Sequence, residues 1–172
     1  NVKAIVPTHG HLDHVGAIVF LSNKYDAPII CTPYTKEIIM AISRDEKIKL
    51  RNEVKVLTSN HSYKVSDKLT IEFINVTHSI PQTVMVAVHT PEGTVIYAND
   101  FKFDNHPTIG RMPNYDRLRE LGKEGVKVLI ADSTRAPNNS KTPSEMVAKE
   151  MLRDVMLGVE SKGKAVIVTT FA

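Results

Sequence analysis

Apolar and polar residues follow two periods along the first part of the chain, one typical of strands and one typical of helices. Residues 2–6 and 28–31 are apolar, β-branched runs that predict strands. Each run is followed by apolar residues spaced three and four positions apart, which predict a helix of about ten residues from His14 and a second helix at 35–43. Strand and helix are therefore expected to alternate here.

The middle of the chain changes to strand-like alternation, and helices return after it. Strands are predicted at 53–57, 69–76, 84–89 and 94–98, and a hairpin turn at 91–93 joins the last two. The later elements are predicted to be a helix near 115–121, a strand at 126–131, a helix after Thr142 and a strand at 165–172. This order predicts one α+β domain with helices outside packed sheets.

The start of the last predicted helix carries a capping pattern. Thr142 is the predicted cap, Pro143 takes the first helical position and Glu145 the third. A threonine and a glutamate in these positions satisfy backbone N–H groups that the first turn leaves free, and proline lacks one. This pattern predicts structure and indicates no chemistry.

Composition narrows the classes of protein. The 172 residues are 42% hydrophobic and 24% charged, which is typical of a globular domain with one core. No apolar run reaches the roughly 18 residues that a membrane helix needs, so we expect no membrane partner. The net charge of +3 is too small to indicate nucleic acid binding. The single cysteine, Cys31, is predicted to be a small core residue, which fits a reducing cytoplasm.

The densest chemistry lies between the first predicted strand and helix, where His9, His11, Asp13 and His14 occur within six positions. Imidazole nitrogen and carboxylate oxygen are ligands that zinc prefers. His9 and His11 are two residues apart and point to the same side of an extended chain, which leaves Asp13 and His14 to face a second metal position. This division indicates two metal ions, and a chance gathering of polar residues is the alternative.

Two further candidates directly follow predicted strands. His78 follows the strand at 69–76, and Asp100 follows the strand at 94–98. A lone histidine or aspartate at a strand end is more often structural than a ligand. The cluster at His9 favours the ligand interpretation for both.

The segment 8–14, followed by His78 and Asp100, resembles the first three metal-binding motifs of the metallo-β-lactamase superfamily. Within it, the runs 78–81, 99–104 and 131–136 resemble the ribonuclease J group of the β-CASP nucleases, notably its archaeal members. The resemblance covers nearly the whole chain and implies an αββα sandwich. We expect residues 1–172 to be a partial metallo-β-lactamase domain that lacks its first strands, the β-CASP domain and the C-terminal segment, because the sequence begins and ends in strand-like runs.

The resemblance implies a role for each matching residue. One zinc would be bound by His9, His11 and His78, the other by Asp13 and His14, with Asp100 bridging, and Mn²⁺ is the alternative metal.

Asp132 matches an acidic motif whose implied role is to support a metal-site histidine, and a turn or helix cap is the alternative. Ser79 and Ser133 are candidates for phosphate contacts, although hydroxyl groups beside strand ends are common.

The histidines outside these motifs, His61, His89 and His106, are expected to be structural.

The expected function is hydrolysis of RNA phosphodiester bonds by water that two zinc ions activate, with Asp13, Asp100 and Asp132 as catalytic residues. The resemblance implies 5′ to 3′ exonuclease action on single-stranded RNA with a 5′-monophosphate, and an endonuclease mode in addition. A homodimer of the full-length protein is considered too, and the fragment alone is expected to have little or no activity. Two alternatives stay open: a small-molecule hydrolase of the glyoxalase or lactamase type, and a non-catalytic RNA-binding subunit.

Overall fold

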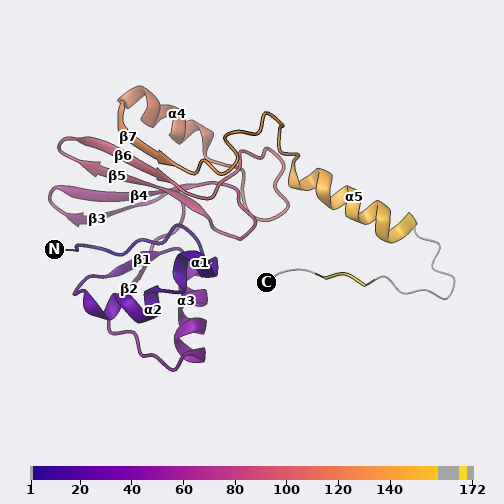
Figure 1. Ribbon diagram of the computed structural model, residues 1–172. Coiled ribbons are helices and arrows are strands. Elements are labelled where there is room, and N and C mark those ends of the chain that lie inside the picture. The colour runs from indigo at the N-terminus through magenta and orange to yellow at the C-terminus, as the bar shows by residue number, and fades with distance from the viewer. Residues whose placement is uncertain (1, 159–166, 170–172) are drawn as a thin grey trace.

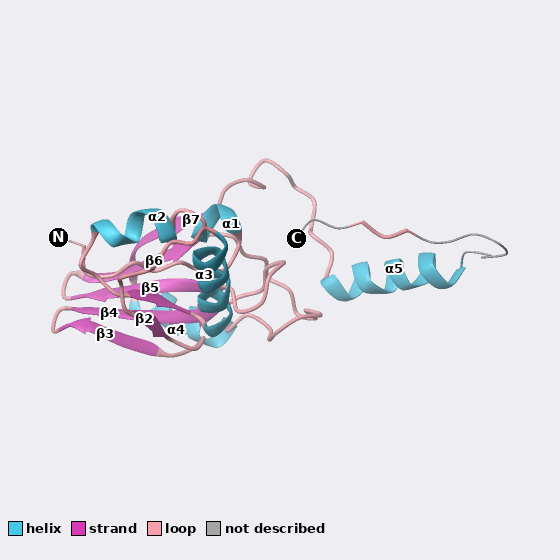
Figure 2. Ribbon diagram, turned by 90° about the horizontal axis from the view of Figure 1, so that it is seen from below, coloured by secondary structure: helices cyan, strands magenta, loops and turns pink. Residues whose placement is uncertain are grey.

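The computed structural model describes residues 2–158 and 167–169, and two β-sheets lie at its centre between layers of helices. Figure 1 shows α1, α2 and α3 against the smaller sheet and α4 against the larger one. Seen from below in Figure 2, α3 and α4 lie on opposite sides of the strands. The predicted α+β class and αββα sandwich are confirmed. No helix among the described residues is long and apolar enough to cross a membrane.

The smaller sheet pairs β1 (Ile29–Cys31) with β2 (Val54–Val56) in parallel, and α3 (Pro33–Asp45) connects them. Successive side chains of β1 point to opposite faces. Ile29 and Cys31 pack toward the helices with Val15, whereas Ile30 packs between the two sheets with Phe73. Cys31 is fully buried, which confirms it as a core residue.

The larger sheet has the order β3-β4-β5-β6-β7. Its first four strands are antiparallel neighbours, and β7 pairs in parallel with β6 because α4 crosses over between them. Leu121 of α4 packs on Ile74 and Met85 and closes the outer face of the sheet. The bounds are β3 Ser62–Ser66, β4 Leu69–Asn75, β5 Val84–Thr90, β6 Gly93–Ala98, α4 Tyr115–Glu124 and β7 Val126–Ala131.

The predicted strand at 2–6 is wrong, because only Ile5 pairs with the smaller sheet. The Ile5 N–H donates to the Pro28 carbonyl and the Ile5 carbonyl accepts from Ile30, both at 2.9 Å. Pro7 has no N–H to continue such pairing, so the chain leaves the sheet edge and enters the segment 8–14, called the histidine loop below.

The predicted ten-residue helix from His14 is also wrong in its extent. It consists of α1 (Leu12–Val15), α2 (Ile18–Leu21) and a 3₁₀ turn (Ser22–Lys24). A Cβ at Gly16 would lie 2.6 Å from the Leu12 carbonyl oxygen, so the turn between α1 and α2 is too tight for any other residue.

The helix predicted after Thr142 is α5 (Glu145–Gly158), but its start differs from the prediction. The Ser144 hydroxyl donates to Asp104 Oδ1, and the other Asp104 oxygen accepts from the Glu145 N–H, each at 2.7 Å. Asp104 is 3% exposed. This distant carboxylate fixes the first turn, so Thr142 is not the cap and Pro143 is not at the first helical position.

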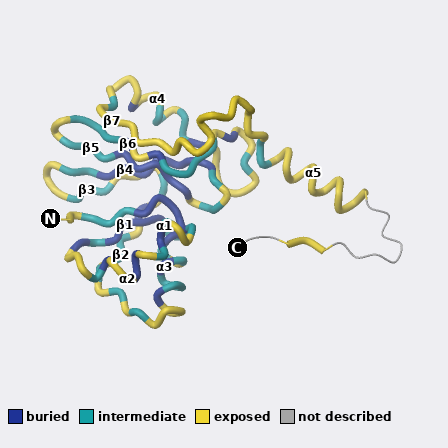
Figure 3. Tube along the Cα trace, in the orientation of Figure 1, coloured by how far each residue is buried: buried dark blue, intermediate teal, exposed yellow. Residues whose placement is uncertain are grey.

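The C-terminal elements differ from the rest in burial. The side chains of α5 are exposed from Met146 onward, and Val128, Leu129 and Ile130 of the edge strand β7 are 48%, 64% and 51% exposed. Figure 3 shows this contrast with the buried strands β4 and β5. Most of the strand predicted at 165–172 lies outside the described residues.

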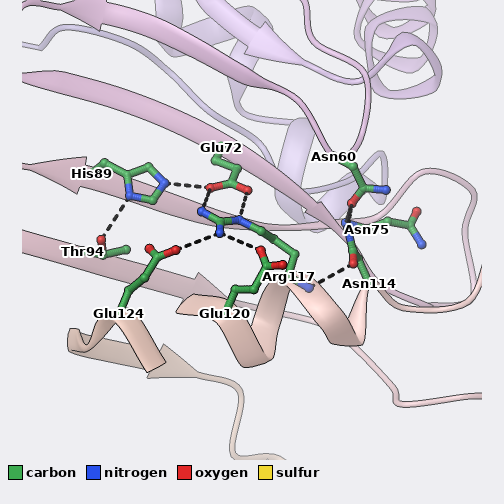
Figure 4. A network of polar contacts seen from close by, with 9 residues as sticks. All are labelled: Asn60, Glu72, Asn75, His89, Thr94, Asn114, Arg117, Glu120 and Glu124. Carbon is green, nitrogen blue, oxygen red and sulfur yellow. Dashed lines mark hydrogen bonds and ion pairs between the residues drawn. The ribbon is translucent and has the colours of Figure 1, made fainter. Parts of the chain in front are cut away.

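A polar network holds α4 against the larger sheet (Figure 4). Glu72 on β4 is 7% exposed and accepts hydrogen bonds from Arg117 Nε at 2.7 Å and Nη2 at 3.1 Å. It also lies 2.8 Å from His89 Nε2, and His89 Nδ1 lies 3.1 Å from the Thr94 hydroxyl. His89 is therefore structural, as predicted. His61 likewise bonds locally, through Nδ1 to the Thr58 hydroxyl at 3.0 Å.

Candidate metal centre

The histidine loop is positioned by the start of β5 and by burial. The Val84 N–H donates to the Thr8 carbonyl at 3.1 Å, and Thr8 and His9 are 3% and 0% exposed. His11 is the last extended residue before α1, with φ −66° and ψ 147°. The predicted convergence of His9 and His11 is present, because His9 Nε2 and His11 Nδ1 lie 3.0 Å apart.

His78 and Asp100 reach the same point from the ends of two other strands. His78 follows β4, Asp100 follows β6, and an antiparallel bridge between Thr77 and Lys102 draws the two segments together. In this bridge the Lys102 N–H donates to the Thr77 carbonyl at 2.8 Å. The loops after two strands that are not neighbours in the sheet thus meet at one edge.

Four side chains form the first group of candidate ligands. One ligand atom from each lies within 4.8 Å of all the others: His9, His11, His78 and Asp100. His78 Nε2 is 3.1 Å from His11 Nδ1 and 3.4 Å from Asp100 Oδ2. Ligands bound to zinc at about 2.0 to 2.1 Å in a tetrahedron lie about 3.4 Å apart. The donor types and their spacing therefore fit a metal ion.

A second group shares Asp100 with the first. His14 Nε2 lies 3.5 Å from Asp100 Oδ2 and 3.4 Å from Asp13 Oδ2. The same Asp100 oxygen is 3.9 Å from His9 Nε2. The Asp13 side chain is 79% exposed and reaches the site from its open side. One carboxylate oxygen thus faces both groups of histidines.

Burial and mutual repulsion keep the central imidazoles neutral. Burial, followed by the neighbouring His14, His78 and His11, lowers the pKa of His9 to about 3. The pKa of His78 is lowered by burial and by His11. A neutral imidazole has a free lone pair, which is the form that binds a metal.

The remaining predicted site residues lie farther from the ligand atoms. The Ser79 hydroxyl is 3.5 Å from His11 Nε2, on the outer side of that ring. The exposed Asp132 carboxylate accepts from the Thr134 N–H at 3.0 Å and hydroxyl at 2.6 Å, and these bonds lower its pKa. Within the described residues, neither Asp132 nor Ser133 makes a hydrogen bond or an ion pair with a histidine. Their roles stay predictions.

Two contacts of the site were not foreseen in the sequence. The Thr8 hydroxyl lies 2.9 Å from His9 Nδ1, and Asn99 Nδ2 lies 2.9 Å from His14 Nδ1. Both residues stand directly before a candidate ligand in the chain. That adjacency is the only sequence signal they carry, because the Asn99 contact joins residues 85 positions apart.

Comparisons with known proteins agree with this geometry. The sequence is 50% identical over 176 residues to a ribonuclease J of Pyrococcus abyssi and 44% identical over 173 residues to one of Methanocaldococcus jannaschii. Each alignment covers 100% of this chain but 39% of the relative, so the chain spans about two fifths of those proteins.

A solved metallo-β-lactamase of Cronobacter sakazakii, with the HARLDQ motif, has a similar fold. It superposes with a TM-score of 0.52 at 16% identity and covers 90% of this chain and 64% of that one. The family described as the β-lactamase superfamily domain matches residues 1–156. The chain therefore belongs to the metallo-β-lactamase superfamily.

Proposed function

We propose that this chain is the metal-binding part of a two-metal ribonuclease. The observation that carries the proposal is the convergence of four ligand atoms within 4.8 Å, with a further histidine and aspartate across the shared carboxylate. The similarity to two proteins named ribonuclease J supports RNA as the substrate. Residues 1–172 would then be part of a larger metallo-β-lactamase domain in the intact natural protein.

The proposed metals are two zinc ions, with Mn²⁺ as the alternative. The first would be held by His9, His11 and His78, the second by Asp13 and His14, and Asp100 would bridge them. Two such ions supply a water nucleophile at neutral pH and offset the charge of the scissile phosphate. The fit rests on neutral imidazoles and two carboxylates, which are zinc-type donors.

The chain's own residues have separate proposed roles. Asp100 fixes the spacing of the two positions, since a single oxygen faces both. Asp13, at the open side, orients the attacking water and accepts its proton. Ser79 and Ser133 contact phosphate oxygens, and Asp132 supports the site from the end of β7, where its N–H donates to the Ala98 carbonyl at 2.9 Å.

The finer proposal is 5′ to 3′ exonuclease action on single-stranded RNA with a 5′-monophosphate, with an endonuclease mode in addition. We propose that the intact protein acts in the cytoplasm, and a homodimer is the assembly to test. These details rest on the resemblance to the ribonuclease J group.

The test uses the intact natural protein, stripped of metal and reloaded with Zn²⁺ or Mn²⁺. It is assayed on 5′-monophosphorylated single-stranded RNA beside a thioester and a β-lactam. We expect metal-dependent release of nucleotides from the 5′ end, lost in His78→Ala and retained in the matched variant His89→Gln. Turnover of only the small substrates, or RNA binding without cleavage, would overturn the proposal.

A further inference from the structure

Two of the candidate ligands, His9 and His14, are each hydrogen-bonded on the side of the ring that faces away from the cluster. Thr8 bonds to Nδ1 of His9 and Asn99 to Nδ1 of His14, so both rings turn Nε2 toward the candidate ligand cluster. A ring that binds a metal through Nε2 carries its proton on Nδ1 and needs an acceptor there. The partner at Nδ1 therefore decides whether Nε2 can be a ligand.

The two rings depend on these partners to different extents. His9 is completely buried, so packing alone restricts its ring. The His14 side chain is 18% exposed and lies at the open side with Asp13. Fewer contacts restrict the ring of His14, and the hydrogen bond to Asn99 carries more of its orientation.

The asparagine amide can serve both forms of His14. Asn99 Nδ2 now faces His14 Nδ1 and donates to it, which leaves the imidazole proton on Nε2, beside Asp13 and Asp100. A half-turn of the amide places Oδ1 at the same point, where it accepts from Nδ1–H and frees Nε2 for a metal. The imidazole proton then moves from Nε2 to Nδ1.

We propose that Asn99 is a positioning residue that sets the orientation and tautomer of His14, and through them the affinity of the second metal position. This inference rests on the proposed two-metal function. The family resemblance implies that Asp132 supports a metal-site histidine. In the structure the Asp132 carboxylate accepts from Thr134, and the residue hydrogen-bonded to Nδ1 of His14 is Asn99.

The test measures metal binding by the intact natural protein, with no activity readout. Zn²⁺ is titrated against a chromophoric chelator, and Co²⁺ absorption reports the geometry of each position. Asn99→Leu keeps the size of the side chain but removes the hydrogen bond. We expect the second metal to bind roughly 10- to 100-fold more weakly and the first to change by less than about twofold.

Matched variants separate positioning from general damage. Asn99→Asp keeps an acceptor behind His14 and is expected to retain the second metal. Asn105→Leu makes the same change at an exposed neighbouring position and is expected to leave both metals unchanged. Thr8→Val is expected to weaken the first position instead.

Two results would overturn the inference alone: normal binding of both metals by Asn99→Leu, or an equal loss at both positions. A wild-type protein that binds no second metal would overturn it together with the proposed function.

Discussion

Two clusters of ionisable side chains, one on the larger sheet and one where the loops after β4 and β6 meet residues 9–14, differ in how their polar atoms are paired. In the network of Figure 4, the Glu72 carboxylate is matched by Arg117 and His89. In the metal centre, imidazoles and Asp100 converge, and no lysine or arginine pairs with that carboxylate among the described residues. In the first cluster, side chains of opposite charge pair with one another, and these pairs stabilise the fold. The second presents neutral donors around one point, as a metal site does.

The largest expected effect separates the clusters by activity. Asp100→Asn removes the carboxylate that faces both groups of histidines, and the rate of RNA cleavage should fall at least about 100-fold. Even the loss of a residue that only hydrogen-bonds to a metal ligand typically lowers metal affinity or activity by roughly 10- to 100-fold. Glu72→Gln should change the rate constant of folded protein by less than about twofold. Initial rates on labelled RNA at saturating metal measure both. Equal losses in the two variants would erase the distinction.

The next effect separates them by stability. Glu72→Gln leaves Arg117 with a weaker partner, and the free energy of unfolding should fall by about 2 kcal/mol. This is less than the usual cost of breaking a fully buried ion pair, because Arg117 is partly exposed. Arg119→Gln breaks the exposed pair with Asp116 and should cost less than about 0.5 kcal/mol. Urea unfolding followed by circular dichroism measures both changes. Similar values for the two variants would show that the network contributes no more than a surface pair.

The pH dependence of stability should follow the same network. Burial raises the pKa of Glu72, but hydrogen bonds from Arg117 and His89 outweigh it and hold the pKa below its ordinary value of 4.5. A lowered carboxyl pKa stabilises the fold above the ordinary value and loses this effect as the pH falls through the folded-state pKa. The advantage of the wild type over Glu72→Gln should therefore be full well above the ordinary pKa of 4.5 and shrink as the pH falls below that value. An advantage that grows on acidification would contradict the assignment.

The smallest effect concerns the rim of the metal centre. The Ser79 hydroxyl is 3.5 Å from His11 Nε2, which is at the limit of a hydrogen bond, so it holds that ring weakly and is available to a phosphate. Ser79→Ala should raise the KM for RNA a few-fold with kcat and metal affinity nearly unchanged. A loss of metal affinity with an unchanged KM would instead assign Ser79 to the support of His11.

The sequence predicted β4, β5 and β6 well, because their apolar residues form a regular strand pattern. β4, β5 and β6 were found within one or two residues because their apolar residues pack between layers. β3 was missed because only two of its five residues, Tyr63 and Val65, are apolar. The start of α5 depends on Asp104, 41 positions before Glu145, which no local pattern shows.

The site was predictable where ligands share a loop. The spacing of His9 and His11 was enough to predict their convergence. His78 and Asp100 were candidates from their positions after two strands, but their assignment to particular metal positions came from the family resemblance, because the bridge between Thr77 and Lys102 that unites them is a tertiary contact. Asn99 was not foreseen for the same reason, since its partner His14 is distant in the chain.

The central claim is that Asp100 and the surrounding histidines hold two metal ions. A crystal structure of the intact natural protein grown with Zn²⁺, with anomalous data collected on both sides of the zinc edge, tests it most directly. We expect two anomalous peaks about 3.5 to 4 Å apart, one beside His9, His11 and His78 and one beside His14, with Asp100 between them. The absence of anomalous density at these residues, with zinc present in the crystal, would contradict the claim.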